Sequence, residues 1–84
     1  MLDINLASLD AFIKHLREQE YSPATITKYA HDVRALLQYA PEGIKDKEHL
    51  NGFRAYLEEQ GYSGASVNSM LGAVNCFLAF LGSD

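Results

Sequence analysis

The chain has 84 residues, 48% of them hydrophobic, and a formal net charge of −4, which allows one domain with one core and by itself argues against a nucleic-acid partner. Its single cysteine, Cys76, excludes an internal disulfide and suits a reducing compartment, and no residue spacing typical of zinc or haem binding occurs, so we expect no cofactor. The longest apolar run, 76–81, is far shorter than the roughly 20 residues that span a bilayer, and we expect a cytoplasmic protein with no membrane partner.

Two helices are predicted in the first half of the chain. Apolar residues recur at helical spacing from about Ser8 to Gln19, which gives the first helix one apolar face. Ser22 and Pro23 are a typical N-cap and first residue of a second helix. This second helix should end within residues 40–43, where a proline and a glycine interrupt the pattern.

Two further helices are predicted in the second half. Asp46 is placed to cap a third helix that runs to Gln60, and Ser63 is placed to cap a fourth helix that closes at Gly82. Since no segment alternates between apolar and polar residues with a period of two, we expect no strand.

The two halves are versions of one pattern. Residues 9–40 match residues 50–81 at an offset of 41 positions, most clearly where 18–26 aligns with 59–67. A period near 40 residues is typical of a helical hairpin used twice, in which neither copy can bury its apolar face alone. The predicted fold is therefore all-α, a four-helix bundle of two repeated helical hairpins.

Charge is distributed unevenly over this repeat. Of the eleven acidic residues, only Asp32 lies on the second or the fourth helix, and it follows Lys28 by four residues, where the two are placed to form an ion pair. The outer arc of the second helix comprises Thr27, Lys28, His31, Arg34 and Gln38, and that of the fourth is small or neutral, comprising Asn68, Ser69, Gly72, Asn75, Cys76 and Ala79. The second helix of each hairpin, with a helix N-terminus that suits a phosphate, is the candidate working surface.

Simpler interpretations of these surfaces stay open. A weakly polar fourth helix is also expected of a central helix that is buried on two sides. The arc from Lys28 to Arg34 is, by frequency, more often an ordinary solvated face than a binding surface.

The order and spacing of both hairpins carry a family resemblance. Residues 12–37 resemble the first hairpin of the core-binding (SAM-like) N-terminal domain of tyrosine recombinases, the phage-integrase family, and residues 53–81 resemble the closing segment of that domain. The likeness covers about residues 6–82. It implies a small helical bundle that forms one half of a clamp around duplex DNA, with its second and fourth helices at the major groove and a separate catalytic domain as the other half.

The resemblance also implies which side chains face DNA. Lys28 and Arg34 would contact phosphate or a guanine edge, Asn68 would read adenine or hold a phosphate, and the hydroxyl side chains would mostly position the backbone. Ser22 and Ser63 suit helix capping better than DNA binding. The predicted DNA-binding residues are Thr25, Thr27, Lys28, His31, Arg34, Ser66, Asn68 and Ser69.

We therefore expect residues 1–84 to form a single DNA-binding domain excised from a longer recombinase, without catalytic residues or a metal site of its own. Its expected partners are duplex DNA and the C-terminal catalytic domain, and the uncharged fourth helix leaves a contact with a neighbouring recombinase protomer open. Two other interpretations remain: a protein–protein interaction bundle, which the net charge of −4 favours, and a repressor-like helix-turn-helix, whose recognition helix would need more long polar side chains than the fourth helix has.

Overall fold

The computed structural model describes residues 4–82, which contain four helices and no strand. The predicted all-α fold is confirmed, with helix bounds α1 Leu6–Glu18, α2 Pro23–Tyr39, α3 Lys47–Glu59 and α4 Gly64–Gly82. The start of α1 differs from the prediction, because the Asn5 side chain accepts a hydrogen bond from the Ser8 backbone N–H at 2.9 Å and caps the helix earlier.

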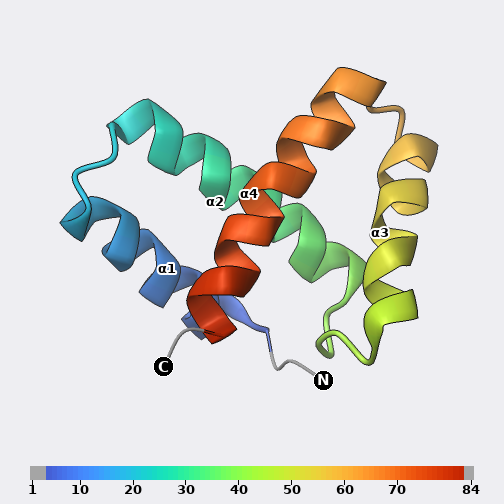
Figure 1. Ribbon diagram of the computed structural model, residues 1–84, viewed down its shortest axis with the longest axis horizontal. Helices are drawn as coiled ribbons and strands as arrows, with labels where there is room; N and C mark the ends of the chain where they lie inside the picture. Colours follow the sequence, from blue (N-terminus) through green and yellow to red (C-terminus); the bar gives the residue numbers. More distant parts are fainter. Residues whose placement is uncertain (1–3, 83–84) are drawn as a thin grey trace.

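The domain is a flat slab of 33 × 27 × 17 Å in which α2 and α4 cross at the centre (Figure 1). The largest contact between elements joins α2 to α4, while α1 lies against α2 and α3 lies against α4. Both second helices begin on the upper side of Figure 1, and the last turn of α4 lies on the lower side. This crossing places the two helix N-termini along one narrow side of the slab, at the top of Figure 1.

The core is built from equivalent residues of the two hairpins. Phe12 and Phe53 are both fully buried, as are Leu16 and Leu57. Phe77 joins the hairpins, with its ring centroid 5.3 Å from that of Phe12. Each hairpin therefore covers the apolar face of the other, as the repeat predicted.

The turn that ends the first helix is also repeated. The Tyr21 N–H donates to the Leu16 carbonyl at 3.1 Å, and the Tyr62 N–H donates to the Leu57 carbonyl at 3.3 Å. In this type of helix end, the residue before the tyrosine takes a left-handed conformation, which favours glycine. The second hairpin has Gly61 at this position, with φ of 93°. The first hairpin has Glu20 at the equivalent position, with φ of 62°, which is also left-handed.

Among residues 4–82, α4 is the one helix that is long and apolar enough to cross a membrane, with 19 residues and a mean hydropathy of 1.4. It contacts all three other helices and buries Val67, Met70, Val74 and Phe77 in the core. Its exposed arc consists of small and amide side chains. Only 28% of this apolar window is buried, so α4 is central in the fold without being buried on two sides.

Candidate nucleic-acid interface

Each second helix begins with the same pair of hydroxyl side chains. The Ser22 hydroxyl accepts from the Thr25 backbone N–H at 3.2 Å and donates to the Thr25 hydroxyl at 2.9 Å. Ser63 makes the two equivalent bonds to Ser66, each at 3.2 Å. Each capping serine thus contacts both the backbone N–H and the hydroxyl of the residue three positions later, which holds the hydroxyls of Thr25 and Ser66 beside the two helix starts. Both caps are as predicted, and each helix start presents a hydroxyl beside uncapped backbone N–H donors, which are that of Ala24 in α2, where Pro23 has none, and those of Gly64 and Ala65 in α4.

Lys28 lies where α2 crosses α4. Its ammonium is 2.6 Å from Asp32 Oδ2 and donates a hydrogen bond to the Ser69 carbonyl oxygen at 3.0 Å. The contact with Oδ2 is an ion pair without hydrogen-bond alignment. The predicted pairing of Lys28 with Asp32 is confirmed, and Asp32 is buried, since only 2% of it is exposed. Lys28 therefore braces α2 against α4 as well as facing solvent.

His31 joins this group from the solvent side. Its Nδ1 is 3.0 Å from Asp32 Oδ1, so the buried carboxylate has a neighbour at each oxygen. The group lines a shallow hollow of about 180 Å³ between α2 and α4, together with Tyr62, Ser66, Ser69 and Met70. The structure thus brings four of the predicted residues together: Lys28, His31, Ser66 and Ser69.

Two other predicted residues of α2 lie outside this hollow. Arg34 is exposed one turn further along the helix, and within residues 4–82 it forms no ion pair. Thr27 is exposed toward α1, where it lines a separate hollow of about 280 Å³ with Arg17 and Tyr21. Arg17 was missed by the sequence analysis, because α1 was set aside as an acidic helix.

Asn68 lies on the other side of α4 and has a partner that the sequence analysis also missed. Arg54 of α3 donates from Nη2 to Asn68 Oδ1 at 3.0 Å. The signal available in the sequence was weak: Arg54 follows the core residue Phe53 and so lies at the edge of the apolar stripe of α3. The basic side chain beside α4 therefore belongs to α3, since α4 has no basic residue of its own.

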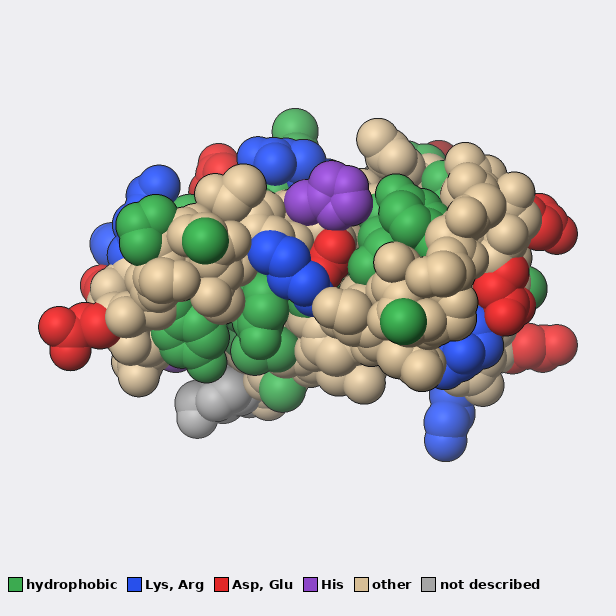
Figure 2. All heavy atoms as spheres, turned by 90° about the horizontal axis from the view of Figure 1, so that it is seen from above, with side chains coloured by type: hydrophobic (Ala, Val, Ile, Leu, Met, Phe, Trp, Pro, Cys, Tyr) green, Lys and Arg blue, Asp and Glu red, His purple; other side chains and the backbone are tan. Residues whose placement is uncertain are grey.

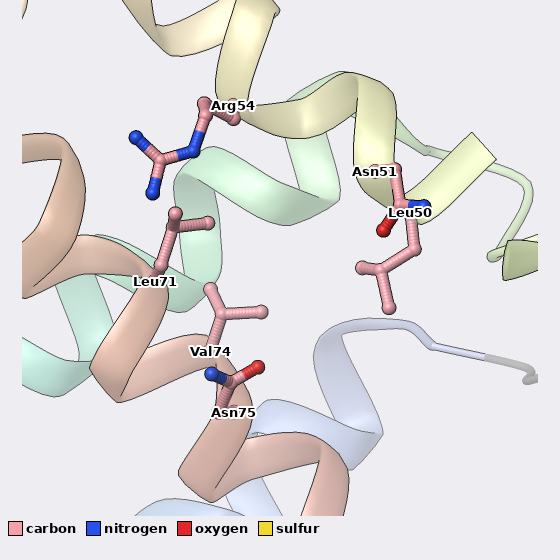
Figure 3. A pocket seen from close by; sticks show the side chains of 6 residues that line it. All are labelled: Leu50, Asn51, Arg54, Leu71, Val74 and Asn75. Atoms are coloured by element: carbon pink, nitrogen blue, oxygen red, sulfur yellow. The ribbon is translucent and has the colours of Figure 1, made fainter. Parts of the chain in front are cut away.

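A groove of about 380 Å³ runs between α3 and α4 beside this pair (Figure 3). Its floor is apolar and its rim carries one guanidinium and two amides, and none of the six lining residues is acidic. The lining residues are Leu50, Asn51 and Arg54 from α3, and Leu71, Val74 and Asn75 from α4.

The face on which α2 and α4 begin has few acidic side chains near its middle. Figure 2 shows this face with basic and histidine side chains toward the centre around one carboxylate, and with most of the other acidic groups at the two ends. The surface is therefore less acidic than the net charge of −4 suggests. Within the part of the chain that the structure describes, no three His, Cys, Asp or Glu side chains gather closely enough to hold a metal ion.

Comparisons with known proteins agree with this architecture. Residues 9–83 match the family described as phage integrase, N-terminal SAM-like domain. Proteins named tyrosine recombinase XerC, from Pseudomonas savastanoi pv. phaseolicola and Pseudomonas syringae pv. tomato, are each 35% identical over 83 residues, an alignment that covers 90% of this chain and 28% of the relative. No solved structure matches significantly. The chain thus spans little more than a quarter of the length of these relatives, and its match over residues 9–83 shows that it belongs to the phage integrase N-terminal SAM-like domain family.

Proposed function

We propose that residues 1–84 form the core-binding domain of a longer site-specific tyrosine recombinase, and that they position core-site duplex DNA for recombination and integration. Family membership supports the proposal, as do relatives named tyrosine recombinase of which this chain spans 28%. The observation that carries the proposal is the repeated helix start, in which the hydroxyls of Thr25 and Ser66 lie at equivalent caps, together with the position of both helix starts along the same side of the domain (Figure 1).

The face offers groups of the kinds that bind DNA. Backbone N–H groups at the starts of α2 and α4, with the hydroxyls of Thr25 and Ser66, suit phosphate oxygens. Arg34 adds an exposed guanidinium for phosphate or for the O6 and N7 atoms of guanine. Thr27, His31, Asn68 and Ser69 are exposed polar groups on the same two helices.

Lys28 has a different place in this proposal. Because Asp32 lies 2.6 Å from its ammonium and the Ser69 carbonyl accepts its hydrogen bond, much of its charge is compensated within the domain. We assign it a double role, as the brace between α2 and α4 and as a modest contributor to DNA binding. Affinity for duplex DNA should therefore be low and strongly dependent on salt.

Other partners follow from the same proposal. DNA breakage and rejoining would be carried out by a C-terminal catalytic domain of the parent protein, and this chain would contribute no chemistry. The exposed neutral arc of α4 would be available to a neighbouring recombinase protomer. A protein with this task acts in the compartment that holds the DNA, which in a bacterial cell is the cytoplasm.

A salt titration tests the proposal. Fluorescence anisotropy would follow binding of the 84-residue chain to a labelled duplex at about 50 and 200 mM salt, a range over which several phosphate contacts change affinity by orders of magnitude. Arg34→Glu should weaken binding roughly tenfold or more, whereas Lys14→Glu, the same charge change on an exposed position of α1, should have a much smaller effect. Binding that is undetectable at low salt would refute the proposal and favour a protein-interaction role.

A further inference from the structure

Arg54 and Asn68 form a polar pair across the second hairpin. The guanidinium extends from α3 to α4, and its Nη2 lies 3.0 Å from Asn68 Oδ1 (Figure 3 shows the side chain pointing toward α4). Both residues are exposed. The pair therefore stands at the surface, beside the start of α4.

The chemistry of arginine sets the direction of the asparagine amide. A guanidinium has N–H donors and no acceptor, so the atom of Asn68 that faces it must be the carbonyl oxygen. The amide nitrogen of Asn68 is then turned away from Arg54, with two donors available to another molecule. One lone pair of Asn68 Oδ1 is occupied by Arg54, so the pair presents more hydrogen-bond donors than acceptors to another molecule.

Arg54 differs from Lys28 in having no acidic counter-ion among the described residues. Glu58 lies one turn further along α3 at a spacing that favours pairing, yet within residues 4–82 no ion pair joins it to Arg54. The only side-chain partner described for the guanidinium is a neutral amide. This leaves a net positive charge next to a helix that has none of its own.

We propose that Arg54 is a further DNA-contacting residue of this domain, and that with Asn68 it forms a donor-rich contact for phosphate oxygens or for the acceptor atoms of guanine. This rests on the proposed DNA-binding function. The acceptor atoms of guanine in the major groove are O6 and N7. The adenine edge requires one donor and one acceptor, so it matches a donor-rich pair less well than guanine does.

Two measurements on the 84-residue chain separate the possible acceptors. Arg54→Gln should reduce affinity for duplex DNA several-fold, with Arg54→Lys recovering part of the loss and Lys14→Gln serving as the control. If the pair binds phosphate, Arg54→Gln lowers the slope of log affinity against log salt by about 0.9 for one lost contact. If it binds guanine, selection from randomised duplexes gives a guanine position that is lost in Arg54→Gln and in Asn68→Ala. Either result supports the proposal, and the loss in the double variant should then be smaller than the product of the single losses.

The results that would overturn the proposal are distinct from a failure of the proposed function. If the unmodified chain binds DNA and Arg34→Glu weakens it while Arg54→Gln does not, the Arg54 assignment is wrong and the proposed function stands. A selected adenine that depends on Asn68 would also overturn the assignment of the pair to acceptor groups of phosphate or guanine. If the unmodified chain binds no DNA at low salt, the proposed function and this inference fail together. Thermal unfolding of Arg54→Gln, expected to match the unmodified chain within a few degrees, shows whether lost binding reflects lost structure.

Discussion

The Lys28 ammonium donates to the Ser69 carbonyl oxygen at 3.0 Å, and these two residues occupy equivalent positions of the two hairpins, 41 residues apart. The two hairpins therefore meet at the same position of their second helices, where α2 crosses α4. The same place holds the buried carboxylate of Asp32. The centre of the candidate DNA face is therefore also the joint between the hairpins.

Removal of the Asp32 charge should strengthen DNA binding. In Asp32→Asn, Lys28 loses its counter-ion and can turn toward a phosphate. We expect a gain in affinity of several-fold, larger than that of Asp10→Asn, which makes the same charge change at an exposed position of α1. Equal gains in the two variants, measured by anisotropy at one salt concentration, would show that only net charge matters and that the brace does not restrain Lys28. The substitution should also cost about 1–2 kcal/mol of unfolding free energy, since a buried polar network is disturbed.

Replacement of Glu20, the left-handed residue of the first hairpin, by glycine should stabilise the domain. Glu20 has φ of 62° where the second hairpin has a glycine, and a non-glycine residue there carries a strain of roughly 1 kcal/mol. Glu20→Gly should therefore raise the unfolding free energy by about 0.5 kcal/mol, or a few degrees in Tm. The change Gly61→Ala should have the opposite effect. An added Cβ there would meet no atom within 4 Å, so the loss would come from the backbone conformation alone. A Tm for Glu20→Gly below that of the unmodified chain would contradict this account.

Replacement of Gly52 in α3 by a larger residue should destabilise the domain, because the Tyr39 hydroxyl oxygen occupies the space of a Cβ. An added Cβ would lie 2.6 Å from the Tyr39 hydroxyl, which donates to the His49 carbonyl at 2.6 Å. Gly52→Ala should lower the unfolding free energy by about 1–2 kcal/mol through overpacking, although alanine favours a helix by about 1 kcal/mol over glycine.

A double-mutant cycle can test whether the Tyr39 hydroxyl oxygen causes the destabilisation by Gly52→Ala. Tyr39→Phe alone should cost about 1 kcal/mol for the lost hydrogen bond, yet in a chain that already carries Gly52→Ala it should cost nothing or stabilise. Gly72→Ala is the matched control, because a Cβ at this position of α4 would meet open space and should be stabilising. Additive effects of Tyr39→Phe and Gly52→Ala in chemical denaturation would contradict the predicted clash.

The features that could be predicted from the sequence depend on residue types within one or two turns. Ser22, Asp46 and Ser63 were correctly identified as N-caps, since a cap needs only a short acceptor side chain at a helix start. The repeat also predicted which faces are buried, because equivalent residues such as Leu16 and Leu57 had to fill equivalent places. Helix order and the all-α fold followed from these local patterns.

The features that could not be predicted depend on how the hairpins meet. The bond from Lys28 to Ser69 forms because α2 crosses α4 at that point, and the crossing also buries Asp32. The contact of Arg54 with Asn68 requires the packing of α3 against α4. A helical wheel describes one helix at a time, so it cannot predict contacts between side chains of different helices. The assignment of the eight predicted side chains to DNA contact stays a prediction.

The most direct test of the central claim is to map the DNA-binding face by NMR. A ¹⁵N-labelled chain would be titrated with a short duplex at low salt, and the shifts of the backbone amides followed residue by residue. The account predicts that the largest changes fall at the starts of α2 and α4, including Thr25, Thr27, Ser66 and Asn68, with small changes at Asp10 and Lys14 on α1. Changes concentrated on α1, or no changes at all while the chain remains folded, would contradict the assignment of this face to DNA.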